Sequence, residues 1–310
     1  MSYHWQFRPY RYPFKHPLHT SHGVWNVREG IILRLEQSGR VGWGEIAPLS
    51  WFGSETLEQA EDFCRQLITK EVIPRVPDEL PACQFAVESA WEMLSAKDNG
   101  SDSLSYSALL PAGAAALDRI MVLLQQGYRT FKWKIGVGDV DTELKIFAEL
   151  VQVLPNDAKL RLDGNGGLGL DGAKAWLEAA DKSKVVEFIE QPLGIDQFSA
   201  MLALSQQYQT LLALDESVAT LAQMQNCYEL GWRSVFVIKP AIAGSPSSLR
   251  QFCQTTQIDA VFSSVFETKI GRVAALRLAA ELSHPKRAIG FGVDHWFDFE
   301  QSPEQIWQDL

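Results

Sequence analysis

Cysteine is scarce in this sequence, and its spacing excludes two kinds of small scaffold. The 310 residues include 4 cysteines, and no two of them form a C-x-x-C pair. A disulfide-stapled domain and a zinc ribbon both require closely spaced cysteines. We therefore expect a protein of the reducing cytoplasm, held together by its hydrophobic core.

Long hydrophobic runs and an excess of basic charge are missing as well. No stretch reaches the roughly 18 uninterrupted apolar residues of a membrane-spanning helix. The aromatic and basic residues 1–14 lack the apolar core of a signal peptide. The sequence has 28 basic and 38 acidic residues, a net charge of −10. This negative charge disfavours nucleic acid and anionic membranes as partners. The expected binding partner is therefore a small molecule or another protein.

The sequence does contain two regions with different patterns. In the first 98 residues we expect a strand over 3–7, then the strand-like runs EGIILRLE and VGWGEIAPL joined by a hairpin at 37–40. Apolar residues at helical spacing predict helices over 56–70 and 81–97. This region is therefore predicted to be an α+β domain that ends near 98–102.

From residue 99 to about 291, short apolar strands alternate with helical stretches. The strand-like runs recur roughly every 25 residues, which is typical of parallel strands with helical connections. Both a (β/α) barrel and a doubly wound sheet produce this repeat. The chemistry at the strand ends favours the barrel.

Five consecutive strands end in a charged residue, in the order Lys134, Asp163, Glu190, Asp215 and Lys239. A charge at the end of a buried strand is costly unless it is paired, and in a barrel all five ends meet at one mouth. Three carboxylates there repel one another unless a cation lies among them, and hard oxygen ligands suit Mg²⁺. We therefore predict a divalent metal between two lysines.

Alternation along the strands adds two residues to this face. Lys132 points to the same side as Lys134, and Arg161 to the same side as Asp163. The positive charges of Lys132 and of a nearby cation favour the neutral, basic form of Lys134, which could then remove a proton. The alternative is that each charge is an ordinary surface residue at a strand-to-loop junction. Their recurrence in step with the strands disfavours it.

The segments FKWKIG, LRLDGN, FIEQPL, LALDES and FVIKPAIAGS resemble, in order and spacing, the signature series of the enolase superfamily, in its muconate-lactonizing subgroup. GWGEIAPL and the following SWFG are similar to that superfamily's capping domain. The resemblance implies an α/β fold, with a (β/α)7β TIM-like barrel over 99–291. It also implies an α+β capping domain over 1–98 that is completed by about 292–310.

The resemblance further implies abstraction of the proton alpha to a carboxylate, assisted by Mg²⁺. It assigns roles to residues at or just after the strand ends. Acid and base chemistry is expected of Lys134 and Lys239, with Lys132 beside them. The expected metal ligands are Asp163, Glu190 and Asp215. Asn165 and Glu216, which follow metal-ligand strands, are expected to hydrogen-bond the ligands.

Within the subgroup, three features resemble the o-succinylbenzoate synthases. The chain is compact, and its last strand region, GFGVDHWF, lacks the Asp-x-Asp of dipeptide epimerases. The run VFSSVFET looks like the serine-rich segment that meets the succinyl carboxylate, so Ser263 and Ser264 are expected substrate contacts. Arg161 is expected to be a third, because it is placed like the synthases' arginine two residues before the first metal ligand. N-acylamino acid racemase, dipeptide epimerase and cycloisomerase activities stay open as alternatives.

The reaction implied is dehydration of 2-succinyl-6-hydroxy-2,4-cyclohexadiene-1-carboxylate to o-succinylbenzoate, in menaquinone or phylloquinone biosynthesis. Lys134 would remove the alpha proton and then protonate the leaving hydroxide, while Lys239 would stabilise the anion from the opposite face. The expected partner is thus a small carboxylate substrate, with no nucleic acid and no membrane. The sequence leaves the oligomeric state open and is compatible with a monomer.

Other signals receive simpler interpretations. Gly164–Gly169 formally match a dinucleotide-binding G-x-G-x-x-G, but that fold leaves both strand-end lysines and Asp215 unexplained. His16, His19 and His22 lie in a Pro-containing segment without helical pattern, predicted to be a solvated loop and similar to the family's mobile cap loop. Trp133 should face the outer helices, and three further tryptophans near predicted loops could line the cavity: Trp25, Trp51 and Trp296.

One alternative belongs to another functional class. The same barrel could bind a ligand or a partner without catalysis and keep its strand-end charges as a structural network of ion pairs. In that case metal would have little effect on the protein.

Overall fold

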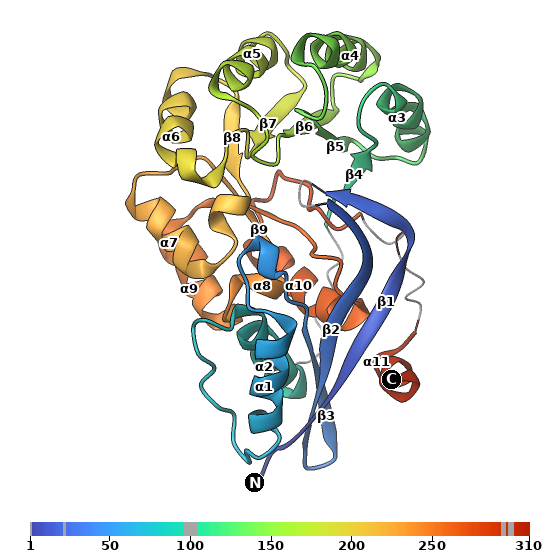
Figure 1. Cartoon of the computed structure of the whole chain (residues 1–310), viewed down its shortest axis with the longest axis vertical. Coiled ribbons are helices and arrows are strands. Elements are labelled where there is room, and N and C mark those ends of the chain that lie inside the picture. The colour runs from blue at the N-terminus through green and yellow to red at the C-terminus, as the bar shows by residue number, and fades with distance from the viewer. Residues whose placement is uncertain (1, 21–22, 96–103, 293–295, 297–300) are drawn as a thin grey trace.

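The computed structural model describes residues 2–20, 23–95, 104–292, 296 and 301–310, and Figure 1 shows their arrangement. An antiparallel sheet with two helices lies beside a larger barrel of parallel strands ringed by helices. The predicted boundary near 98–102 lies outside the described residues. None of the described helices has the length and apolar character needed to cross a membrane.

The N-terminal sheet has the strand order β1–β2–β3, with β1 at His4–Thr20, β2 at Gly23–Gln37 and β3 at Arg40–Ile46. Its two helices are α1 (Leu57–Leu67) and α2 (Pro81–Ser95). The predicted hairpin at 37–40 is confirmed. Ser38 and Gly39 both have positive φ, as a two-residue turn between twisted strands requires.

The first strand is much longer than the sequence predicts. We expected a strand over 3–7 and a solvated loop around the histidines, but β1 continues to Thr20 and pairs with β2 as far as Gly23. The loop prediction is therefore wrong for His16 and His19, while His22 lies outside the described residues. Pairing with β2 overrides the local polar and Pro-rich pattern, with a register shift between Pro13 and Leu18.

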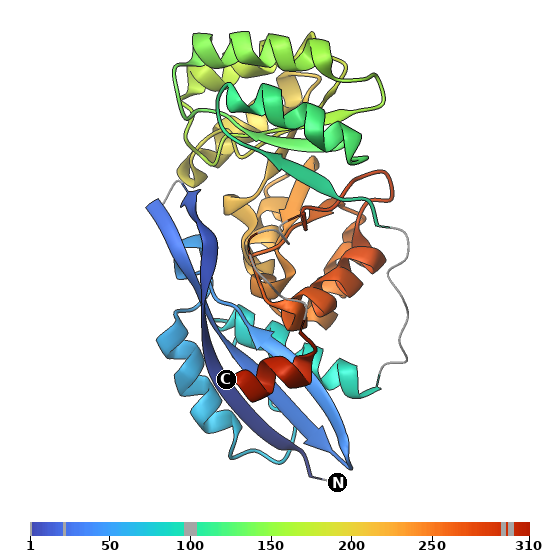
Figure 2. The same ribbon diagram turned by 90° about the vertical axis from the view of Figure 1, so that its right-hand side faces the viewer.

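The two faces of the N-terminal sheet pack against different layers, because side chains alternate along β2. Ile31, Leu33 and Leu35 are buried in the core that includes α1 and α2. Ile32 faces the other way, into a smaller cluster with Ile270 and Ile306. The sheet is thus covered on both faces, and Figure 2 shows the C-terminal helix α11 (Pro303–Asp309) lying against it.

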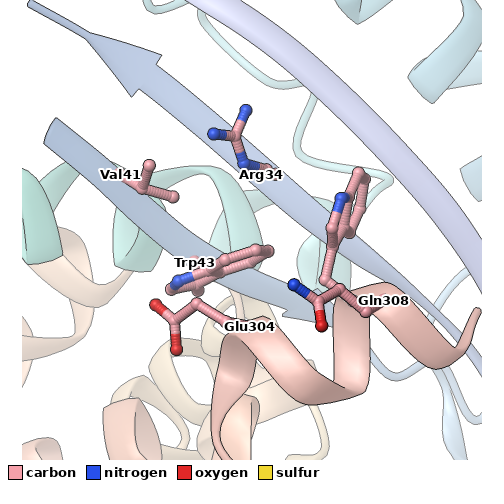
Figure 3. A pocket seen from close by; sticks show the side chains of 6 residues that line it. Arg34, Val41, Trp43, Glu304 and Gln308 are labelled. Carbon is pink, nitrogen blue, oxygen red and sulfur yellow. The ribbon is translucent and has the colours of Figure 1, made fainter. Parts of the chain in front are cut away.

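A small surface cavity lies between this sheet and α11, next to contacts that join them. Trp43 of β3 and Trp307 of α11 are 5.6 Å apart between ring centroids. They line a cavity of about 270 Å³ together with Arg34, Val41, Glu304 and Gln308 (Figure 3). These contacts attach the end of the chain to the N-terminal sheet.

The second region is a closed barrel. Its strands lie in chain order, and all neighbouring pairs are parallel. They are β4 (Ser107–Leu110), β5 (Thr130–Lys134), β6 (Lys159–Asp163), β7 (Val186–Glu190), β8 (Leu211–Leu214), β9 (Val235–Ile238) and β10 (Asp259–Phe262).

Residues 289–290 complete the barrel at the eighth position. Single parallel bridges join Ile289 to Tyr106 on one side and Gly290 to Ser263 on the other. The backbone N–H of Ser107 donates to Ile289 O at 2.9 Å, and that of Gly290 donates to Phe262 O at 2.7 Å. This closure confirms the barrel and excludes the doubly wound sheet, and with it the dinucleotide-binding alternative.

The barrel helices connect successive strands on the outside. They are α3 (Ala115–Gln125), α4 (Val140–Val153), α5 (Leu170–Asp181), α6 (Phe198–Gln207), α7 (Leu221–Glu229), α8 (Pro240–Ala243), α9 (Pro246–Thr256) and α10 (Lys269–Leu282). Trp133 is fully buried and packs edge-on against Trp176 of α5. Its predicted outward orientation is therefore confirmed.

Hydrogen bonds join the N-terminal sheet and its helices to the barrel. The buried carboxylate of Glu45, on β3, accepts from the backbone N–H groups of Thr268 and Gly271 at 2.8 Å each. It thereby satisfies free N–H groups in the first turn of α10 and opposes the positive end of that helix dipole. On the opposite face of the sheet, α2 contributes Glu92, which forms an ion pair with Arg250 of α9.

Two glycines of β3 allow α2 to pack directly on the sheet. A Cβ atom on Gly42 would lie 1.9 Å from Ala90 O, and one on Gly44 would lie 2.1 Å from Ala86 O. Backbone carbonyls of a helix cannot move aside as a flexible side chain can. The sheet and the helix are therefore close enough only because both positions lack a side chain.

We predict that Gly44→Ala lowers the free energy of unfolding by about 3 kcal/mol, since the added methyl forces α2 away from β3. Gly169→Ala is the matched control, because its φ is −79° and a Cβ there would meet nothing within 4 Å. Urea unfolding followed by circular dichroism measures both changes. Equal stability of the two variants would show that the close approach has no energetic importance.

Candidate active site

The charged strand ends lie side by side at one mouth of the barrel. In the strand register, Lys134 of β5 lies beside Asp163 of β6, and Asp163 beside Glu190 of β7. Asp215 directly follows β8, and Lys239 directly follows β9. The three acidic residues are each at most 6% exposed. The structure thus brings together the five residues that the sequence singles out.

Lys132 is the counter-ion of two of these carboxylates. Its Nζ lies 2.8 Å from Asp163 Oδ2 and 2.7 Å from Glu190 Oε1. Burial alone would lower the pKa of Lys132, but the charges of Asp163, Glu190 and Asp215 outweigh it and raise the pKa. Lys132 therefore stays charged, which suits it to hold carboxylates in place rather than to transfer protons.

The two strand-end lysines have different surroundings. Lys239 forms an ion pair with Asp215, and its Nζ lies 4.1 Å from the ring centroid of Phe52, a cation–π distance. Phe52 belongs to the short 3-10 helix η1 (Ser50–Phe52), so the N-terminal region supplies part of the site. Lys134 is half-buried, and its ammonium has no hydrogen-bond or ion-pair partner among the described residues. It is the lysine left available for chemistry.

The site carries more buried negative charge than its lysines satisfy. Burial raises the pKa of Glu190 to about 8, with Lys132 opposing this effect and Asp163 and Asp215 adding to it. Burial likewise raises the pKa of Asp215, against the opposing charge of Lys239. These upward shifts mean that the ionised carboxylates repel one another in a poorly solvated place.

Two buried oxygen atoms beside the carboxylates also have no hydrogen-bond partner among the described residues: Asn165 Oδ1 and Glu216 Oε2. The other ends of these side chains meet, because Asn165 Nδ2 donates to Glu216 Oε1 at 3.1 Å. The backbone N–H of Asn165 donates to Asp163 Oδ1 at 3.1 Å. Oxygen acceptors without donors are the chemistry that a hard cation or its water ligands would satisfy.

The donor set therefore fits a divalent cation such as Mg²⁺, with Asp163, Glu190 and Asp215 as carboxylate ligands. In the described part of the chain, no three acidic, histidine or cysteine side chains already surround a common centre. Lys132 lies between Asp163 and Glu190 instead. Metal binding would thus require the carboxylates to turn toward a shared position.

The residues expected to bind substrate make other contacts in this structure. Ser264 Oγ donates to Glu267 Oε2 at 2.8 Å, and Ser263 Oγ donates to Gly290 O at 3.3 Å. The guanidinium of Arg161 donates to Glu187 at 2.6 Å and to Ala288 O at 2.8 Å. Substrate contact by Ser263, Ser264 and Arg161 stays a prediction, and these contacts do not favour it for Ser264 and Arg161.

Arg161 belongs to a network inside the barrel, near the beginnings of the strands. Glu187 also pairs with Arg287 at 2.9 Å, and Arg287 pairs in turn with Asp259. Glu187 lies near the start of β7, and Asp259 begins β10. The guanidinium of Arg161 thus points away from the mouth at which Asp163 lies.

An aromatic cluster adjoins Lys239 through Phe52. Trp51 lies 5.8 Å from Phe52, and Trp25 lies 5.8 Å from Trp51, measured between ring centroids. Phe266, which follows β10, lies 5.7 Å from Trp25 and 6.1 Å from Trp296. All three tryptophans expected near the cavity therefore belong to this aromatic cluster. Phe14 of β1 also belongs to it, through contacts with Trp25 and Trp296.

Sequence reasoning missed two residues that shape the mouth. Phe52 follows Trp51 in the SWFG segment, but its place on Lys239 depends on how the two regions pack. The buried Glu143 of α4 accepts from the backbone N–H groups of Gly136, Val137 and Gly138 at 2.7 to 3.0 Å. It fixes the loop that follows Lys134. The glycines of KIGVG were the available signal for a constrained loop.

Comparisons with known proteins agree with this geometry. Residues 115–306 match the family model described as Enolase C-terminal domain-like, and residues 4–94 match the one described as MenC, N-terminal domain. An o-succinylbenzoate synthase of Thermosynechococcus vestitus (strain BP-1) is 42% identical over 302 residues, which covers 94% of this chain and 93% of that protein. One from Yersinia pseudotuberculosis is 31% identical, covering 88% and 86%.

Solved structures give the same picture. The crystal structure of o-succinylbenzoate synthase from Thermosynechococcus elongatus BP-1, complexed with Mg in the active site, matches with a TM-score of 0.93 and 39% identity. It covers 99% of this chain and 100% of that one. The L-Ala-D/L-Glu epimerase from Bacillus subtilis matches with a TM-score of 0.82 at 21% identity, covers 97% and 92% of the two chains, and shows the shared fold.

We predict that Arg161→Met lowers the free energy of unfolding by about 3 kcal/mol, since it leaves the buried carboxylate of Glu187 short of one partner. Arg287→Met, which breaks the same network from its other side, is the matched comparison and should cost a similar amount. Urea unfolding measures both. If Arg161→Met were as stable as the wild type but bound substrate more weakly, the substrate-binding role expected from the sequence would be correct instead.

Proposed function

The chain belongs to the o-succinylbenzoate synthase family of the enolase superfamily, and we propose that it performs the Mg²⁺-dependent syn-dehydration of 2-succinyl-6-hydroxy-2,4-cyclohexadiene-1-carboxylate to o-succinylbenzoate. The observation that carries this proposal is the barrel mouth itself. Three buried carboxylates there lie between Lys134, which has no ion-pair partner among the described residues, and Lys239, which forms an ion pair with Asp215. The chain also shares 42% identity with an o-succinylbenzoate synthase over nearly its whole length.

The reaction removes one proton and one hydroxide from adjacent carbons and leaves an aromatic ring. Asp163, Glu190 and Asp215 would hold Mg²⁺, which when bound supplies positive charge for the substrate carboxylate as its alpha carbon loses the proton. Lys134 takes that proton on its Nζ, the C–O bond breaks, and the same ammonium returns the proton to the departing hydroxide as water. Among the described residues, Lys134 alone combines a place at the mouth with an ammonium that has no hydrogen-bond or ion-pair partner there.

Lys239 acts from the other side of the carboxylates. Its ammonium, held by Asp215 and covered by the Phe52 ring, offers a fixed positive charge to the delocalised anion. Lys132 orients Asp163 and Glu190 and keeps its own proton. Asn165 and Glu216 would support the ligand set, because each has a buried oxygen without a donor among the described residues, and these oxygens could accept hydrogen bonds from water bound to the cation.

We further propose that residues 1–98, completed by about 292–310, form a cap over a catalytic domain at 99–291. The contact of Phe52 with Lys239 supports this division, because it places a side chain of the N-terminal region inside the site. The aromatic cluster would exclude water from the anion while the ring becomes aromatic. The product points to a role in quinone biosynthesis in the cytoplasm.

Lys134→Ala is expected to lower kcat by about 10²–10⁴-fold, the usual contribution of general acid–base catalysis, without loss of Mg²⁺ binding. Lys159→Ala, at the exposed start of β6, is the control and should keep full activity. Product formation from the dehydration substrate is measured by liquid chromatography. If the wild-type chain racemised N-succinylamino acids and left this substrate unchanged, the synthase assignment would be wrong.

Mg²⁺ is expected to stabilise the wild-type protein, by about 2.7 kcal/mol at a concentration of 100 times Kd. This effect should vanish in Asp163→Asn and persist in Asp157→Asn, an exposed aspartate paired with Arg129. Thermal unfolding with and without MgCl2 measures it. A wild-type melting temperature that does not respond to Mg²⁺ would favour the structural network of ion pairs over a metal site.

A further inference from the structure

Gln191 links the three strand ends that carry the carboxylates. It directly follows Glu190 at the end of β7, is fully buried and has a φ of +35°. A left-handed backbone is uncommon for a residue other than glycine and persists where the surrounding contacts hold it. Gln191 is therefore a residue whose conformation other parts of the site determine.

Its side-chain oxygen holds the backbone beside the next carboxylate. Gln191 Oε1 accepts from the backbone N–H of Asp215 at 3.0 Å and from that of Ser217 at 3.2 Å. Asp215 is the residue from which the short 3-10 helix η3 (Glu216–Val218) starts. The side chain of Gln191 thus fixes the turn that aims the carboxylate of Asp215.

The amide nitrogen holds the same turn from its other side. Gln191 Nε2 donates to Ser217 Oγ at 2.8 Å and to Leu193 O at 3.0 Å. A primary amide has two N–H donors and an oxygen that accepts two hydrogen bonds, so all four are used. A carboxylate would have no donor for Leu193 O, and an apolar side chain would satisfy none of the partners.

The backbone of Gln191 contacts the neighbouring strands on both sides. Its N–H donates to Ala213 O on β8 at 2.8 Å, and its carbonyl oxygen accepts from Gly166 N at 2.7 Å. Gly166 lies in the turn that follows Asp163. One buried residue thus touches the turn after Asp163, adjoins Glu190 and holds the backbone of Asp215.

We infer that Gln191 is a positioning residue, which holds the backbone that carries Asp163, Glu190 and Asp215 so that their carboxylates can turn toward a single divalent cation. The inference rests on the proposed Mg²⁺-dependent function and names a residue that sets its metal affinity. Gln191 is fully buried, so its side chain is not exposed to a bound substrate. Because Gln191 already holds the backbone of Asp215, this residue does not have to become ordered when the cation binds.

The test is the affinity of the purified protein for Mg²⁺ alone, measured by isothermal titration calorimetry without substrate. Gln191→Met keeps the length of the side chain and removes all four hydrogen bonds. We expect its Kd for Mg²⁺ to rise by about 10- to 100-fold, the usual effect of losing a residue that orients metal ligands. Circular dichroism confirms that the variant is folded.

Gln84→Met is the matched control. Gln84 is a partly buried glutamine that, like Gln191, joins two segments, accepting from Ser245 N at 3.1 Å and donating to Asp78 at 2.9 Å. It contacts none of the residues at the metal-binding mouth. Loss of stability without loss of Mg²⁺ affinity is expected in this variant.

A milder variant keeps the inference testable if Gln191→Met does not fold. Ser217→Ala removes the bond from Nε2 to the hydroxyl and leaves Oε1 on Asp215 N. The Kd of this variant for Mg²⁺ should rise by about 2- to 10-fold, which is the usual contribution of one hydrogen bond.

Three results overturn the inference. The first is a folded Gln191→Met variant whose Kd for Mg²⁺ is unchanged. The second applies if Gln191→Met does not fold, and is a Ser217→Ala variant whose Kd is unchanged. In both cases Mg²⁺ binding by the wild type would leave the proposed function standing. The third is a wild-type chain that does not bind Mg²⁺, which would overturn the proposed function as well.

Discussion

The crowding of carboxylates at one end of a closed barrel is the constraint on which the rest of the structure depends. Parallel strands in chain order place Asp163, Glu190 and Asp215 next to one another, where each is nearly inaccessible to water. Such a group is stable only with positive charge close by. Lys132 and Lys239 supply part of it, while burial and the neighbouring carboxylates still raise the pKa of Glu190. A divalent cation at this place would both relieve the repulsion and activate a substrate carboxylate.

The N-terminal region contributes by being fixed to the barrel on several sides. Gly42 and Gly44 let α2 lie directly on β3, and α2 in turn contacts α9. Glu45 of the same strand binds the beginning of α10. The long β1–β2 ribbon and η1 then carry aromatic side chains to Lys239 and Phe266. The apolar wall of the site is thus built from segments that lie far from the barrel in sequence.

Much of the catalytic end could be predicted from the sequence, and the reason is geometric. In a parallel barrel every strand ends at the same mouth, so the position of Asp163 or Lys239 at the end of an apolar run is enough to place it. The length of β1 could not be predicted, because pairing with β2 overrides its local Pro-rich pattern. The partners of Arg161 were missed for a similar reason, since Glu187 lies on the neighbouring strand β7 and Ala288 lies 127 residues further along the chain. Gln191 lies in the segment FIEQPL, yet its proposed role depends on which backbone groups its amide reaches in the folded chain.

The central claim is that one divalent cation lies among the strand-end carboxylates, between Lys134 and Lys239. Anomalous diffraction from crystals soaked in MnCl2 tests it most directly, because Mn²⁺ accepts the same oxygen ligands as Mg²⁺. The account predicts one strong peak bonded to an oxygen of each of Asp163, Glu190 and Asp215, at about 2.0 to 2.2 Å as for Mg²⁺. A mouth without such a peak, with Lys132 still bridging Asp163 and Glu190, would contradict it.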